Sequence, residues 1–359
     1  MNGIGVVVIG RNEGDRLRRC LESLAPAAVP VVYVDSGSTD ASVATARAAG
    51  VEVVELDPSR PFSAGRARNE GFARCVERHP AVRSVMFVDG DCEVVTGWLD
   101  RAERELDGRP ELAVVCGRRR ELRPERSVYN RLADLEWDTP IGLVPSCGGD
   151  ALFRVSDFAA VGGFDPSVKA GEEPELCRRL RERGRSIARI DAEMTRHDLN
   201  MTRFAEWWRR QFRVGYHGLA IESRFPPTPT EGRPRPPSLF GPSLRRARLW
   251  GIGWPVVVGG GMVAGGWAGG GFAALGVLGL GVGLLLAQAG RLAWRVRRRV
   301  DRPGDAVVHG LLMVIEKWAN LAGQVGYRRD QRQGRGARLI EYKHATQAAA
   351  TAPAPEAVR

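Results

Sequence analysis

A run of 41 residues without a charged side chain, residues 250–290, is the strongest constraint on how this chain can fold. About 20 apolar residues cross a bilayer as one helix, so the run is long enough for two crossings. Glycines gather at its centre, in residues 265–271, where a turn between two helices is expected. Arginines on both flanks favour two crossings with both ends cytoplasmic, and the fifteen glycines of the run leave a re-entrant hairpin as the alternative.

Positive charge is concentrated around that run. Residues 1–223 hold 33 basic and 35 acidic side chains, whereas residues 224–359 hold 20 and 7. Basic charge beside an apolar segment favours a membrane surface as partner, and no nucleic acid is expected. The six cysteines form no C-x-x-C pair, which indicates a reducing compartment, and the N-terminus lacks the basic region of a signal peptide. The first domain is therefore expected in the cytoplasm, at the inner (plasma) membrane.

Short apolar runs alternate with helical patterns before residue 224. The expected strands are residues 4–9, 29–34, 51–56, 84–88 and 112–116, and the expected helices include 17–24, 41–49, 64–76 and 176–183. This order predicts an α/β fold with a mostly parallel sheet flanked by helices, because parallel strands need crossover connections. Loops at the strand ends then meet at one edge of the sheet, where such folds bind ligands.

Two aspartates, Asp89 and Asp91, follow the apolar run 84–88. Residues i and i+2 of an extended segment share a face, so their carboxylates repel unless a cation lies between them. Oxygen ligands suit Mg²⁺ or Mn²⁺, and such an ion suits a diphosphate. An ordinary Asp-Gly turn after a strand is the alternative.

Three further segments carry candidate site residues. The loop 35–40, with Asp35 and Ser36, either meets an anion or ribose at a helix start or forms only a helix cap. Arg66 and Arg68 either clamp a diphosphate or are solvated helix residues. The turn containing Gly148, Gly149 and Asp150 lets a ligand approach the backbone, unless it is a plain tight turn.

Glu172 and Glu173 open the expected helix after residue 171. Acids in a first helical turn complement the helix dipole, and one held there can also deprotonate a hydroxyl. His197 is a conceivable metal or phosphate contact, or a structural histidine.

Five motifs in this order resemble the family 2 glycosyltransferases, which have a GT-A fold. They lie at residues 6–13, 34–40, 88–91, 147–154 and 171–176, and the resemblance covers about residues 3–190. It implies an inverting transfer of a sugar from a UDP- or GDP-sugar to an acceptor hydroxyl. It also implies a divalent metal, Mg²⁺ or Mn²⁺, as cofactor.

The resemblance assigns roles to individual residues. The residues expected to bind the nucleotide sugar are Asn12, Glu13, Asp35, Ser36, Arg66, Arg68 and Asp89. The metal is expected at Asp91, with Asp89 and His197, and the acceptor side at Gly148, Gly149 and Asp150. Glu173 is expected to be catalytic, together with Glu172. Glu173 stands where the family usually has an aspartate base, so its side chain is one methylene longer. The Gln-x-x-Arg-Trp motif of processive synthases is absent from the sequence, which disfavours processive synthesis.

The expected organisation has five parts. They are a GT-A domain (1–223), a Pro-rich linker (224–244), a two-helix transmembrane hairpin (245–302), an interfacial helix with a basic tail (303–344) and a disordered C-terminus (345–359). Membrane attachment favours a lipid-linked or glycan acceptor for envelope or exopolysaccharide synthesis. Two other functions remain open: a membrane-tethered scaffold that binds a nucleotide sugar without turnover, and a sugar nucleotidyltransferase.

Overall fold

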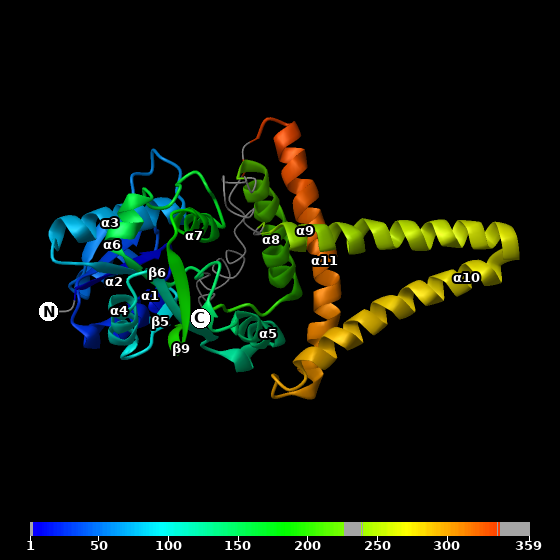
Figure 1. The fold of residues 1–359 in the computed structure, drawn as a ribbon, viewed down its shortest axis with the longest axis horizontal. Helices are drawn as coiled ribbons and strands as arrows, with labels where there is room; N and C mark the ends of the chain where they lie inside the picture. The colour runs from blue at the N-terminus through cyan, green and yellow to red at the C-terminus, as the bar shows by residue number, and fades with distance from the viewer. Residues whose placement is uncertain (1–2, 226–237, 239, 336, 338–359) are drawn as a thin grey trace, which may run out of the picture. The chain divides into compact units, whose positions relative to one another are not determined.

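The computed structural model describes residues 3–225, 238, 240–335 and 337 (Figure 1). The chain divides into two compact units, residues 1–126 with 133–200, and residues 127–132 with 201–359. The division falls at residue 200 rather than 223, because the helix that follows packs with the C-terminal helices. Most of the expected linker and the expected disordered end at 345–359 lie outside the described residues.

The first unit holds the sheet. Its strands are β1 (Ile4–Gly10), β2 (Val31–Asp35), β3 (Glu52–Glu55), β4 (Ser84–Asp89), β5 (Cys92–Val94), β6 (Leu112–Glu121), β7 (Gly142–Leu143), β8 (Ala151–Arg154) and β9 (Ser186–His197). Its helices are α1 (Asp15–Leu24), α2 (Ser42–Ala48), α3 (Ala64–Arg78), α4 (Trp98–Gly108), α6 (Val155–Ala160) and α7 (Glu172–Glu182), with short 3₁₀ turns at Ala25–Ala27 and Pro124–Arg126. Helix α5 (Val128–Trp137) begins in residues of the second unit.

The strand order is β3-β2-β1-β4-β8-β6-β9-β5, with β7 on β9. The expected α/β class with flanking helices is confirmed. Strands β3, β2, β1 and β4 are parallel, but β8 runs antiparallel to both β4 and β6, and β5 and β7 run antiparallel to β9. The sheet is therefore mixed rather than mostly parallel, because its second half contains short antiparallel strands that need no crossover helix.

Helix α3 lies close to the sheet because glycines line the contact. A Cβ atom on Gly71 would lie 2.4 Å from Cγ1 of Val7 and 2.7 Å from Cγ2 of Val34. On the strand side, a Cβ atom on Gly5 would lie 2.4 Å from Sγ of Cys75. These two glycines let the helix backbone settle on β1 and β2.

The second unit is helical in its described part. It comprises α8 (Phe204–Arg224), α9 (Gly241–Arg248), a π-helical turn (Leu249–Gly253), α10 (Trp254–Val296) and α11 (Pro303–Arg332). Helix α10 is interrupted at Gly270, where φ is 71° and ψ is −169°, and Figure 1 shows the chain reversing direction along α10. Within the helical stretch Gly241–Val296, an 18-residue window reaches a mean hydropathy of 2.1, which by length and composition is enough to cross a membrane.

Helices α8 and α11 cross at two glycines. A Cβ atom on Gly215 would lie 1.9 Å from the carbonyl oxygen of Asn320, and one on Gly323 would lie 2.1 Å from that of Phe212. Near this crossing the hydroxyl of Tyr216 donates to Oδ2 of Asp330 at 2.8 Å. Small residues thus let α8 pack closely on α11.

We predict that Gly71→Ala lowers stability by about 1–3 kcal/mol, because its methyl group would overlap two stiff valine side chains. Gly108→Ala is the matched control, since Gly108 ends α4 with no atom within 4 Å of its Cβ position. Thermal unfolding of both detergent-purified variants measures the difference. An equal melting temperature for the two variants would contradict the close packing of α3.

Candidate active site

The ends of three parallel strands meet at one edge of the sheet. Gly10 at the end of β1 is in register with Asp35 of β2, and Ile9 is in register with Asp89 of β4. The convergence expected from the strand and helix order is therefore present. The motifs at residues 34–40 and 88–91 therefore lie on either side of the motif at residues 6–13.

Asp91 lies against His197. Nε2 of His197 is 3.0 Å from Oδ2 of Asp91, and both side chains are buried. The contact depends on β5 and β9, which pair antiparallel with Cys92 opposite His197. The possible ligand atoms of Asp91, Cys92 and His197 lie within 4.8 Å of one another. The ring of Trp137 stacks on that of His197, with the two centroids 5.1 Å apart. The sequence predicted His197 as a candidate ligand, but it predicted neither strand β9 nor the stacking of Trp137 on His197.

Asp89 is joined to the start of α7 through Arg68. Nη2 of Arg68 donates to Oδ1 of Asp89 at 2.8 Å, and Nη1 donates to Oε1 of Glu172 at 2.7 Å. The arginine side chain is only 3% exposed, whereas Asp89 is 32% exposed, so the ion pairs are buried at the arginine and reach solvent at Asp89. Arg68 thus positions two carboxylates of the candidate site.

The glycine-rich turn closes against the same groups. Gly148 has a φ of +92°, and a Cβ atom on Gly149 would lie 3.2 Å from Oδ2 of Asp89 and 3.3 Å from Nη2 of Arg119. Asp150 is fully buried, with Oδ2 2.7 Å from Nη2 of Arg119 and 2.7 Å from Oγ1 of Thr195. The carboxylate of Asp150 is therefore held by internal partners. The sequence shows an arginine triplet at 118–120, but nothing in it singles out Arg119.

Asp35 organises the loop that follows β2. One carboxylate oxygen accepts hydrogen bonds from the amides of Gly37 and Ser38, and the other accepts from the hydroxyls of Tyr33 and Ser38, at 2.5–2.9 Å. The amide of Ser36 donates to the carbonyl of Gly10. The loop is thus fixed to both strand ends, with Asp35 as its internal cap.

The loop after β1 is tied to the same segment. Asn12 has a φ of +55°, and its Oδ1 accepts a hydrogen bond from the amide of Thr39 at 2.7 Å. The amide of Glu13 donates to Oγ of Ser42, and its carboxylate pairs with Arg16 at 2.8 Å. The two predicted nucleotide-binding loops therefore form one cross-linked unit.

Arg66 is not brought to Asp89. Its guanidinium bonds to Oε1 of Glu70 at 2.7 Å and to the carbonyls of Asp57 and Arg60 at 3.0 and 2.9 Å. It is 4% exposed. Arg66 fixes the 57–60 loop, whereas Arg68, on the other side of α3, faces the candidate site.

Glu173 is buried beside two cysteines. Its Oε1 accepts a hydrogen bond from the amide of Cys147 at 2.6 Å and lies 3.1 Å from Sγ of Cys147 and 3.0 Å from Sγ of Cys177. Burial raises the pKa of Glu173. Glu172, by contrast, is engaged by Arg68. The sequence predicted both acids but not the two cysteines, which share no motif.

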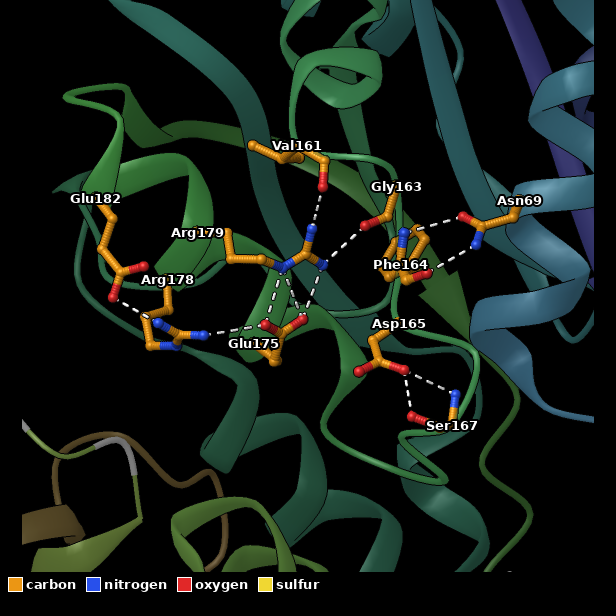
Figure 2. A network of polar contacts seen from close by, with 10 residues as sticks. All are labelled: Asn69, Val161, Gly163, Phe164, Asp165, Ser167, Glu175, Arg178, Arg179 and Glu182. Atoms are coloured by element: carbon orange, nitrogen blue, oxygen red, sulfur yellow. Dashed lines mark hydrogen bonds and ion pairs between the residues drawn. The ribbon is translucent and has the colours of Figure 1, made fainter. Parts of the chain in front are cut away.

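The helix that carries these acids is anchored by Glu175 (Figure 2). Arg179 donates to both oxygens of this buried carboxylate at 2.8–3.0 Å, and also to the carbonyls of Val161 and Gly163. Asn69 of α3 exchanges two hydrogen bonds with the backbone of Phe164. The third acid of the motif is thus structural, and it fixes the first turn of α7.

Curated relatives include a pre-mycofactocin glycosyltransferase of Mycobacterium tuberculosis (strain ATCC 25618 / H37Rv). It is 27% identical over 239 residues, which are 62% of this chain and 48% of the relative. The chain thus spans about half the length of this relative.

Among solved structures, a mannosyltransferase from Pyrobaculum calidifontis, determined with GDP-Man and Mn²⁺, matches with a TM-score of 0.58 at 17% identity. The match covers 91% of this chain and 87% of that one. This likeness concerns the fold, and it confirms the expected GT-A-like architecture. Residues 5–159 match the family model described as glycosyl transferase family 2.

Proposed function

We propose that this protein is an inverting glycosyltransferase that moves a sugar from a UDP- or GDP-sugar to an acceptor hydroxyl. The main support is the combination of Asp91 beside His197 with a buried carboxylate, Glu173, at the start of α7. Asp91 and His197 suit a metal ion at the diphosphate end of a donor, and Glu173 suits removal of a proton from the acceptor. The cross-linked loops around Asn12 and Asp35 are the proposed nucleoside site.

Glu173 is the proposed base. It accepts the proton of the acceptor hydroxyl as the hydroxyl oxygen forms a bond to the anomeric carbon and the bond from that carbon to the diphosphate oxygen breaks. Its raised pKa supports this role, because a base works best when its pKa lies near the operating pH. Arg68 holds both Glu172, which precedes the base in the chain, and Asp89 in place.

Asp91 and His197 are the proposed metal ligands. A carboxylate oxygen and an imidazole nitrogen 3.0 Å apart fit a divalent cation, and imidazole together with carboxylate suits Mn²⁺ at least as well as Mg²⁺. Such an ion supplies positive charge beside the departing diphosphate. Asp89, held by Arg68, completes the acidic surroundings.

We further propose that the second unit anchors the enzyme in the inner membrane with its catalytic domain cytoplasmic. The apolar helix α10, interrupted at Gly270, and the basic excess of the C-terminal part support a hairpin with both ends on the cytoplasmic side. A lipid-linked or glycan acceptor used in envelope or exopolysaccharide synthesis fits such an anchor.

Metal dependence is tested by nucleoside diphosphate release from a panel of UDP- and GDP-sugars, with native lipid extract as acceptor source. We expect EDTA to abolish release and Mn²⁺ or Mg²⁺ to restore it. His197→Ala should raise the Mn²⁺ concentration for half-maximal release by at least about 10–100-fold, the usual cost of losing even an outer partner of a metal ligand. Asp107→Asn, on the exposed surface of α4, is the control. Release that persists in EDTA would refute the metal site.

The base is tested by Glu173→Gln, which keeps the size of the side chain and removes its proton affinity. We expect kcat to fall by about 10²–10⁴-fold with donor binding unchanged. Glu182→Gln, near the exposed end of the same helix, should keep normal turnover. The heat of donor binding measures donor affinity, and release of the nucleoside diphosphate measures turnover. Full turnover in Glu173→Gln would rule out this base.

The hairpin is tested by labelling in cells. All six native cysteines are buried, so a membrane-impermeant maleimide has little background. We expect Gly271→Cys, at the predicted turn, to react from outside the inner membrane, and Arg298→Cys to react only after permeabilisation. Labelling of both positions only after permeabilisation would favour the re-entrant alternative.

A further inference from the structure

Two cysteines that no motif explains converge on the proposed base. Cys147 belongs to the glycine-rich turn, and Cys177 lies one helical turn beyond Glu173 on α7. Their sulfur atoms are 3.7 Å apart, and each lies within 3.1 Å of the same oxygen of Glu173. All three side chains are buried.

We propose that Cys147 and Cys177 are positioning residues: their thiols, together with the amide of Cys147, hold the carboxylate of Glu173 in one orientation and stabilise its ionised form. This inference rests on the proposed function, in which Glu173 is the base. It adds a reason why a glutamate can occupy that position. The extra methylene of glutamate lets the carboxylate reach the turn at residue 147, where the amide and the thiol of Cys147 can donate hydrogen bonds to it.

The chemistry of the thiols supports this role. Burial raises the pKa of Cys177 to about 11 and that of Cys147 well above its ordinary value, so both thiols keep their protons near neutral pH. A protonated thiol can donate to a carboxylate, whereas a thiolate would repel it. The two sulfur contacts and the backbone amides of residues 147 and 148 each oppose the upward effect of burial on the pKa of Glu173.

The other charged and titratable groups around Glu173 belong to three elements. From β6, Cys116 has its pKa raised to about 12 by burial, with Arg189 of β9 opposing that rise and Glu173 adding to it. From α3, Arg68 bonds to the adjacent Glu172 and not to Glu173. The Glu173 carboxylate itself accepts hydrogen bonds from Cys147 and Cys177.

The sign of the expected effect follows from these contacts. Removing a thiol donor raises the pKa of Glu173 further, so a larger fraction of the base is protonated and idle at a given acidic pH. The acid limb of the pH–rate profile should then move to higher pH. Serine keeps a donor at the same place, so it should move the limb less than alanine does.

The test is the pH dependence of kcat/KM in Cys177→Ala and Cys177→Ser, measured on the detergent-purified full chain. Cys75→Ala is the control, because Cys75 of α3 is equally buried but packs against Gly5 of β1, away from Glu173. We expect the acid limb to shift to higher pH in Cys177→Ala, to shift less in Cys177→Ser, and to stay in place in the control. A shift shared by all three variants, or absent from Cys177→Ala, would overturn the inference.

A second readout does not depend on activity. A carboxyl whose pKa is higher in the folded than in the unfolded chain makes stability fall as pH rises between the two pKa values. That window widens when a donor is removed, so the loss of melting temperature in Cys177→Ala should grow as pH rises, while that of Cys75→Ala should not. A loss independent of pH would also contradict the inference.

The two readouts separate this inference from the proposed function. If Glu173→Gln is inactive but Cys177→Ala shows neither shift, the base stands and the positioning role falls. If Glu173→Gln is fully active, the base falls. The pH dependence of melting then decides whether the cysteines still stabilise the ionised carboxylate.

Discussion

The buried guanidinium of Arg68 is the interaction on which the candidate site depends. It joins Asp89, at the end of a central strand, to Glu172, at the start of a helix far along the chain. A buried charge is costly unless it is paired, so the buried guanidinium of Arg68 depends on these two carboxylates. Gly149 approaches the same groups because it has no side chain. The strand, the helix and the turn are thereby locked around one cation.

Acidic groups outnumber basic ones around this centre. Its described carboxylates are those of Asp89, Asp91, Asp150, Glu172 and Glu173, whereas the described guanidiniums bonded to them are those of Arg68 and Arg119. This excess of acidic groups suits a divalent cation, the cofactor proposed above.

Glycine determines the packing of both units in the same physical way. In the first, Gly71 lets α3 lie on β1; in the second, Gly215 and Gly323 let α8 and α11 cross with their backbones almost in contact. A sequence pattern marks such residues as weak helix formers. Their use becomes clear only when the neighbouring backbone is known. The same limit explains why the sequence predicts a sheet domain that extends to residue 223: it does not reveal that α8 packs on α11.

The sequence by itself determined the alternation of strands and helices, the acidic pair after β4, the acids at the start of α7 and the uncharged run that ends in arginines. These are local signals of periodicity and composition, which short-range physics fixes. Tertiary structure alone decided that β8, β5 and β7 pair antiparallel, and that the charged strand β9 brings His197 to Asp91. It also decided that Arg66 serves a loop while Arg68 serves the site. Pairing across long separations depends on which surfaces remain to be buried once local elements form, and local sequence patterns do not reveal those surfaces.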